Sequence, residues 1–255
     1  MKLSHKLCGA ALVAAAGVAL AAPNTTKAVD TKTGTGHIGF TVNTDPTDTS
    51  GVVPTDPGVT DGTTITNIPS VVNPGSFGII AITPLEFETH DVLTANTQRD
   101  YNASFFHANQ GTTDSNYPAF DVQNFVKYQD LRTMETHAYK LSATLTQNFK
   151  DTASGVELKG ANITYKEANL TQTGDAALTP NASDVTTQGT ISTASPTFDF
   201  IKNQGADGKG YGQFELNFGD KTSGDKAVTL NIPASSAIGA GDYNAVITWT
   251  LSETL

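Results

Sequence analysis

Short runs of alternating apolar and polar residues recur along this chain, separated by stretches rich in Gly, Asn, Asp and Thr. In the clearest run, Tyr139, Leu141 and Leu145 would lie on one face of an extended strand, with Lys and Ser or Thr between them. Such a period of two indicates half-buried β-strands rather than helices. Comparable runs lie at Leu85 to Glu88, Phe125 to Leu131, Ala161 to Tyr165, Phe198 to Ile201, Gln213 to Phe218, Ala227 to Ile232 and Tyr243 to Leu251. We therefore expect an all-β fold of about nine or ten strands, an antiparallel sandwich-like or irregular barrel domain with long loops.

The N-terminus has the three parts of a secretory signal peptide. Lys2 and Lys6 precede an apolar run, Leu7 to Leu20, which small residues follow. We expect residues 1–21 to be removed by cleavage after Ala21, with cleavage after Ala28 as the alternative. The run is shorter than the roughly 20 residues of a transmembrane helix, and no second apolar span exists in the sequence. The prediction is a secreted protein without a membrane span in its mature chain.

Charge and cysteine content exclude several classes of function. The 15 basic residues are scattered among 25 acidic ones, for a formal net charge of -10. A nucleic-acid partner is not expected, because binding phosphates requires clustered Lys and Arg. Cys8, the only cysteine, lies in the predicted signal peptide, so the mature chain would have no disulfide or thiolate metal site. Its stability must come from a hydrophobic core.

The segment before the main strands is irregular in composition. Thr35 to Val42 alternates and predicts a first strand, but residues 43–62 are rich in Asp, Pro, Thr and Gly and contain two Thr-Asp-Pro repeats. We interpret residues 43–62 as a flexible excursion. Calcium binding there is the less favoured alternative, because Pro follows Asp and the Asp-x-Asp-x-Asp-Gly loop is missing.

The end of the chain carries a compact motif. In Tyr243 to Leu251, the only tryptophan, Trp249, and Leu251 share one strand face. This Trp-x-Leu ending resembles the C-terminal motif of the WxL domain family. That family typically has a second such motif in mid-domain, where this chain has Tyr139-Lys-Leu141, with tyrosine in place of tryptophan. The resemblance covers about residues 30–255 and marks Trp249, Leu251, Tyr139 and Leu141 as the wall-binding motif.

The resemblance implies a function at the cell surface. WxL domains belong to Gram-positive surface proteins that associate non-covalently with peptidoglycan, and no Leu-Pro-x-Thr-Gly sorting signal is present in this sequence. It also implies other WxL proteins and membrane-anchored surface proteins as partners. The alternative is a structural or adhesive subunit held at the surface by protein contacts in a WxL complex, for example by adding a strand at an open sheet edge.

The motif residues could act in two ways. Aromatic residues alternating on a strand usually pack inward, which favours a structural role for Trp249 and Tyr139. Direct contact, with an exposed ring stacked on a sugar, is the other possibility. The hydroxyl of Tyr139 would need a hydrogen-bonding partner if it were buried.

No motif indicates catalysis, a metal or a cofactor, and we expect a protein that is not an enzyme. The acidic residues considered for glycan hydrolysis, Glu86, Glu88, Asp91, Asp130 and Glu135, form no recognisable signature. The histidines His37, His90, His107 and His137 lack the spacing of a zinc site. The glycine-rich stretch from Gly205 to Gly212 precedes a strand rather than a helix, and we interpret it as a mobile hairpin connection.

Overall fold

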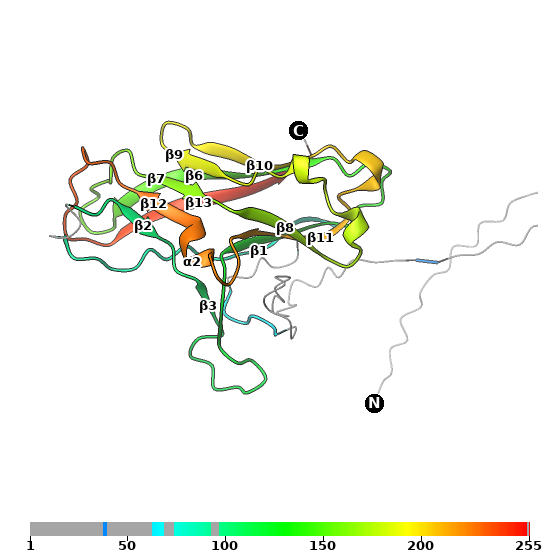
Figure 1. Cartoon of the computed structure of the whole chain (residues 1–255), viewed down its shortest axis with the longest axis horizontal. Helices are drawn as coiled ribbons and strands as arrows, with labels where there is room; N and C mark the ends of the chain where they lie inside the picture. Colours follow the sequence, from blue (N-terminus) through cyan, green and yellow to red (C-terminus); the bar gives the residue numbers. More distant parts are fainter. Residues whose placement is uncertain (1–37, 40–62, 69–73, 93–96, 254) are drawn as a thin grey trace, which may run out of the picture. The chain divides into compact units, whose positions relative to one another are not determined.

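The computed structural model describes residues 38–39, 63–68, 74–92, 97–253 and 255. The predicted signal peptide, most of the predicted strand at 35–42 and the predicted excursion at 43–62 lie outside these residues. The elements below belong to one compact unit, Thr41–Leu255, which is built almost wholly of antiparallel strands (Figure 1). The expectation of an all-β fold is confirmed.

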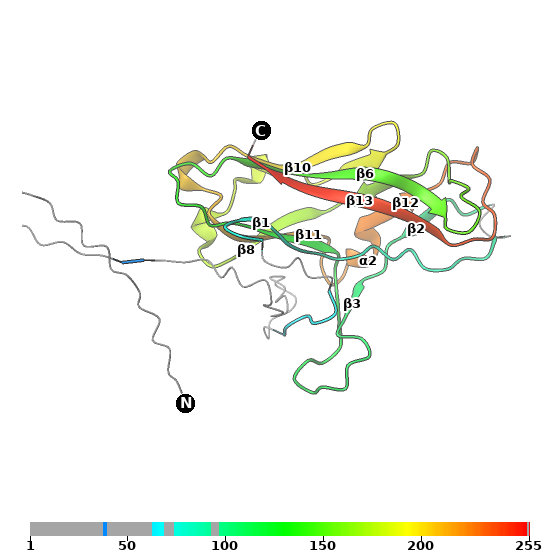
Figure 2. The ribbon, with the colours of Figure 1, turned by 180° about the vertical axis from the view of Figure 1, so that it is seen from behind.

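Two of the sheets form the layers of a sandwich. The first, which we call the motif sheet, has the order β10-β6-β13, with bounds Thr197–Asn203, Tyr139–Asp151 and Tyr243–Ser252. The second, the facing sheet, has the order β1-β5-β11-β8, with bounds Phe77–Ile82, Phe125–Asp130, Gly212–Phe218 and Ala168–Thr173. The two layers lie one above the other in both views (Figures 1 and 2). In the described part of the chain the sheets stay open and form no closed barrel, so the sandwich alternative is the correct one.

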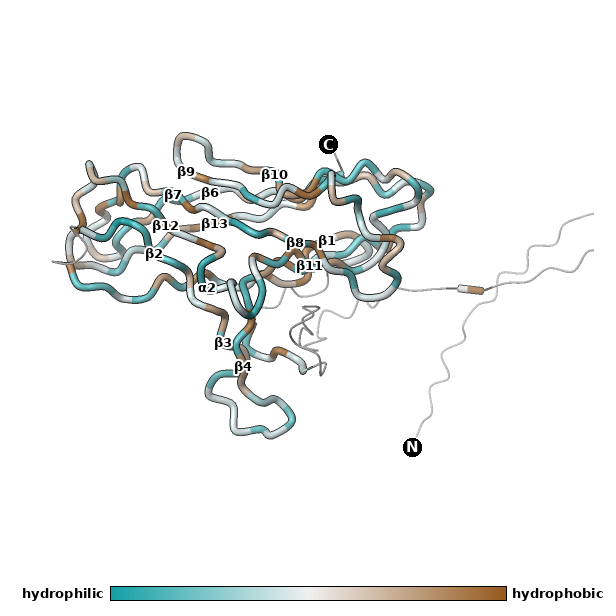
Figure 3. Tube along the Cα trace, viewed as in Figure 1, coloured by the Kyte–Doolittle hydropathy of each residue, from teal (hydrophilic) through white to brown (hydrophobic). Residues whose placement is uncertain are grey.

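Smaller elements complete the unit. A third sheet has the order β2-β12-β7-β9, with bounds Asp100–Asn102, Val228–Asn231, Asn162–Tyr165 and Gly189–Ser192. Strands β3 (Phe106–Ala108) and β4 (Phe120–Val122) pair as an arm that projects from the sandwich, and its tip is mostly hydrophilic (Figure 3). The short helices are η1 (Ala176–Leu178), η2 (Ala182–Asp184), η3 (Ala206–Gly208) and α2 (Gly224–Ala227).

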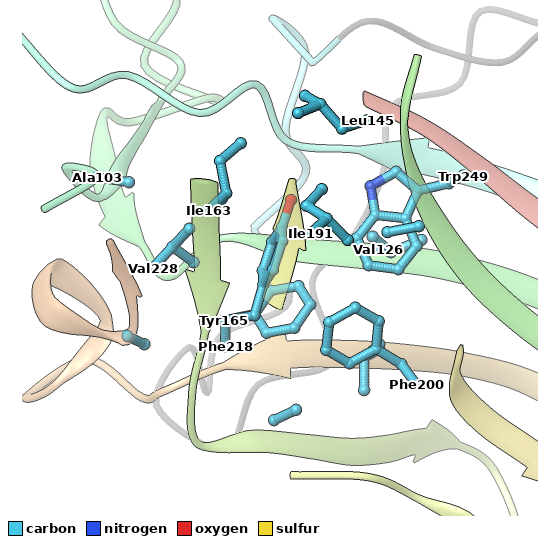
Figure 4. Close-up of a cluster of buried hydrophobic side chains, with 14 of the residues drawn as sticks. Ala103, Val126, Leu145, Ile163, Tyr165, Ile191, Phe200, Phe218, Val228 and Trp249 are labelled. Atoms are coloured by element: carbon cyan, nitrogen blue, oxygen red, sulfur yellow. The ribbon is translucent and has the colours of Figure 1, made fainter. Parts of the chain in front are cut away.

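The hydrophobic core connects all three of these sheets. Four aromatic side chains meet in it, namely Tyr165 from β7, Phe200 from β10, Phe218 from β11 and Trp249 from β13 (Figure 4). Because each comes from a different strand, the cluster fastens the third sheet to both layers of the sandwich. A smaller core under the arm contains Ile65, Ile68, Ala81, Ala108, Val122 and Phe125.

The structure differs from the sequence-based strand assignment in several places. Strands β1, β2, β3, β4, β8 and β9 lie outside the predicted runs, and two predicted elements differ from the structure. Leu85 and Phe87 lie in an extended segment that is not a strand, although both side chains pack against the core. Leu85 and Phe87 alternate with polar residues because one side of this segment packs against the core. An extended segment without a paired strand can show the same pattern. The glycine-rich stretch from Gly205 to Gly212 joins β10 to β11, which belong to different sheets, so it is not a hairpin connection.

Candidate functional site

The two motifs lie side by side in the motif sheet. Strands β6 and β13 are antiparallel, and their register places Leu251 directly opposite Leu141 and Trp249 opposite Ala143. Directly opposite residues in such a pair have side chains close enough to interact. The structure therefore brings the two motifs, which are far apart in the sequence, into one continuous apolar surface facing the core.

Trp249 is a core residue. Only 9% of it is exposed, and its ring lies 5.4 Å from that of Phe200, 5.9 Å from Tyr165 and 6.0 Å from Phe218, measured between centroids (Figure 4). These separations are those of favourable aromatic pairs. Trp249 thus joins strands from different sheets and presents little ring surface to a ligand.

Tyr139 is buried completely and has a partner for its hydroxyl group. That hydroxyl lies 3.2 Å from the hydroxyl of Tyr128, and the two rings meet edge to face at 5.6 Å. Burial raises the pKa of Tyr139 well above its ordinary value, which keeps the phenol neutral. The pair satisfies two polar groups that would otherwise be buried without partners.

The leucines of the two motifs differ in burial. Leu141 is fully buried, whereas Leu251 is half-buried near the end of β13. The alternation in the sequence predicted both leucines on the inward face. Leu251 is less enclosed because β13 is an edge strand of the motif sheet, whereas Leu141 lies on the central strand β6.

A charged cluster beside the motifs holds the chain end. Arg132 binds the Asp130 carboxylate through two side-chain hydrogen bonds of 2.8 and 2.7 Å, and its Nη1 lies 2.7 Å from Glu253, just beyond β13. The Arg132 guanidinium also lies over the ring of Phe77, 3.9 Å from its centroid. His137 Nδ1 is 3.0 Å from Asp130. Residues of β1, β5 and the end of β13 are thereby linked through one cation.

Asp130 owes its ionised state to these partners. Burial pushes the pKa of this carboxyl group upward, but the hydrogen bonds from Arg132 and the nearby His137 side chain outweigh burial and bring the pKa below its ordinary value. Asp130 is fully buried, so the loss of Arg132 would leave a poorly compensated charge in the core.

The other acidic residues and histidines considered from the sequence are dispersed. His107 Nδ1 lies 2.5 Å from Asp121 on the arm, and His90 Nε2 lies 2.7 Å from the Phe87 carbonyl oxygen. His37 lies outside the described residues. Among the residues the structure describes, no three His, Cys, Asp or Glu side chains are grouped as a metal would require. None of the helices in the described ranges has the length and apolar character of a transmembrane span.

A groove beside β13 was not apparent from the sequence. It has a volume of about 830 Å³ and is lined by the inner face of β13, by the segment that follows β1 and by the loop before β13. Trp249 forms part of its lining. The only sequence signal for it was the half-buried alternation at Leu85 and Phe87, which is equally typical of a core strand.

Comparison with known proteins assigns the chain to a family. Residues 25–254 match the family model described as WxL domain, surface cell wall-binding. No curated protein and no solved structure matches the chain. The matched region is nearly the whole chain rather than a C-terminal part, and it contains both paired motifs. The chain belongs to the WxL family of surface domains that bind the cell wall.

Proposed function

We propose that this protein is secreted from a Gram-positive bacterium and retained at its surface by non-covalent binding of the WxL domain to peptidoglycan. The family match across residues 25–254 carries this proposal. The N-terminal pattern of Lys2, Lys6 and the apolar run that follows supports secretion. The acidic net charge of -10 disfavours attraction to anionic wall polymers as the basis of retention.

The paired motifs act in this proposal as structural anchors. Tyr139 is fully buried and Trp249 nearly so, which leaves little aromatic surface for stacking on a sugar. Their packing holds β6 and β13 together and so shapes the surface beside them. Wall binding then depends on the motifs because they maintain the sheet.

We propose binding without catalysis. Asp130 and Glu215 are fully buried, and each lies beside a cation, Arg132 and Lys127 respectively. Carboxylates held in this way are poorly suited to exchange protons with a glycan. The acidic residues near the groove are exposed and have no pairing that indicates the acid and base of a hydrolase.

Sedimentation with insoluble, protein-free peptidoglycan tests the proposal. The mature protein, beginning at Ala22, is expected to appear in the pellet with purified Gram-positive sacculi, whereas a sample without sacculi stays in the supernatant. A folded protein that remains in the supernatant with sacculi would contradict direct wall binding.

One observation favours a second function, that of a subunit in a surface complex. Strand β13 pairs with β6 on one side, and no strand in the described residues pairs with its other side. Such an edge can accept a strand from a partner protein, here another WxL protein or a membrane-anchored surface protein. Retention on whole cells combined with no binding to purified sacculi would favour this alternative.

A further inference from the structure

The groove beside β13 has the dimensions of a ligand site. Its volume of about 830 Å³ falls within the roughly 300–1,000 Å³ that is common for binding clefts. One wall consists of β13 from Tyr243 to Trp249, and another is the chain from Ile82 to Val92. That chain runs beneath β13 in Figure 2. The groove therefore follows a strand rather than forming a round cavity between loops.

The strand that lines the groove lies at the edge of its sheet. Ala245 and Ile247 are half-buried on its inner face, so the wall of the groove is apolar but open. Within the described chain, the outer side of β13 has no paired strand. An open edge offers backbone N–H and C=O groups to which the amide groups of a short peptide can hydrogen-bond.

Apart from His90, the charged side chains that line the groove are all acidic. Glu86, Glu88 and Asp242 are exposed along the groove, and no Lys or Arg among the described residues belongs to its lining. Nε2 of His90 bonds the Phe87 carbonyl oxygen, so this nitrogen donates to the protein and not to the groove. These acidic residues form a rim that attracts an ammonium group and repels phosphate groups.

A buried acceptor lies in the same lining. Asn124 is 1% exposed, and its Nδ2 donates a hydrogen bond to the Ser104 carbonyl oxygen at 2.9 Å. Its Oδ1 has no hydrogen-bond partner among the described residues. Buried acceptors are rarely left without a donor, and those that are often mark a binding site or an ordered water. A ligand that carries N–H groups would supply the missing donor.

We propose that this groove binds the peptide stem of peptidoglycan, with the stem extended along β13 and its primary amine at the Glu86 and Asp242 rim. The inference rests on the proposed function, because it names the part of the wall that the domain recognises. The limited volume suits a short peptide. A neutral glycan strand would make no use of the acidic rim, and teichoic phosphates would be repelled by it.

Binding of a synthetic stem tripeptide with capped ends, N-acetyl-L-alanyl-D-isoglutaminyl-L-lysine amide, in which the lysine amine is the only charged group, tests the role of the amine in the mature protein. By NMR titration, we expect acetylation of the lysine amine to weaken binding about tenfold, as the loss of two rim ion pairs would. The double variant Glu86→Gln, Asp242→Asn is expected to lose affinity to the same extent. The matched double variant Glu135→Gln, Asp207→Asn removes the same charge outside the groove and should bind as the wild type does. Equal affinity of the two peptides for the wild type would overturn the proposal.

Blocking the groove tests its position. Ala245→Phe places a ring on the inner face of β13, whereas Thr250→Phe places the same ring on the exposed face of the same strand. We expect Ala245→Phe to abolish sedimentation with sacculi and Thr250→Phe to leave it intact, with thermal melts showing that both variants are folded. Folded Ala245→Phe that still sediments would place the wall site elsewhere.

The final comparison separates this inference from the proposed function. Wild-type protein is expected to sediment with intact sacculi and to lose binding when an amidase has removed the stems from the glycan. Equal sedimentation with stripped glycan would refute the stem-peptide proposal while supporting wall binding. No sedimentation with intact sacculi would refute the proposed function itself.

Discussion

Replacing Trp249 with alanine is predicted to destabilise the domain strongly. The side chain is 91% enclosed and contacts three aromatic rings on three other strands, each within 6.0 Å between centroids. Removal of a buried Phe or Trp typically costs about 3–5 kcal/mol. Because three favourable ring pairs are lost together, we expect a loss of about 4–5 kcal/mol in the free energy of unfolding, the upper half of that range. This is a large part of the roughly 5–15 kcal/mol that stabilises a typical protein.

Urea unfolding followed by far-ultraviolet circular dichroism measures this loss. Trp249→Phe retains one aromatic ring and should recover part of the stability. Thr250→Ala, on the exposed face of the same strand, should stay within about 0.5 kcal/mol of the wild type. A loss below about 1 kcal/mol for Trp249→Ala would refute the reasoning that this ring fastens the sheets together.

Wall binding by the same variant distinguishes the two roles of the motif. Under conditions in which Trp249→Ala is still folded, we expect it to sediment with peptidoglycan as Trp249→Phe does, because Trp249 lines the groove with only the small exposed part of its ring and the acidic rim is unchanged. A folded Trp249→Ala variant that no longer sediments, while Trp249→Phe does, would show that the ring contributes to the ligand site directly.

Three further substitutions probe the surroundings of the motifs. Tyr139→Phe leaves the buried Tyr128 hydroxyl without its partner at 3.2 Å, so a loss of about 1–3 kcal/mol is expected in urea unfolding. Leu141→Ala empties a fully buried position and should cost about 2–5 kcal/mol in the same assay. Arg132→Ala removes the main partner of buried Asp130, and we expect a loss of about 3 kcal/mol at neutral pH. Since partners lower the pKa of Asp130, its contribution is present above the unfolded pKa of about 3.9 and disappears as the pH falls through the lower folded value. A pH series of melting temperatures should therefore show the wild type losing stability as the pH falls below about 3.9 and Arg132→Ala losing less, so that the two curves converge in acid; parallel curves would contradict this account.

The buried motifs have a consequence for interpreting binding experiments. Trp249 and Tyr139 belong to the core, so their substitution changes stability and binding together unless folding is measured alongside. Substitutions along the groove are better probes, because Glu86 and Asp242 are exposed and contribute little to the core.

The sequence by itself determined the strand faces. Alternation is a local property, and it correctly placed Tyr139, Leu141, Trp249 and Leu251 on the inward sides of two strands. The Trp-x-Leu ending also pointed to the family that residues 25–254 match. Burial of Trp249 and Tyr139 followed the general tendency of aromatic side chains on strands to pack inward.

Only the tertiary structure decided which strands are neighbours. Alternation carries no information about pairing, which depends on contacts between segments far apart in the chain. Thus the register that sets Leu141 opposite Leu251, and the meeting of Trp249 with Tyr165, could not be derived from the local pattern. The groove beside β13 likewise exists because this strand lies at the sheet edge while an unpaired segment crosses near it, and both facts are properties of the assembled fold.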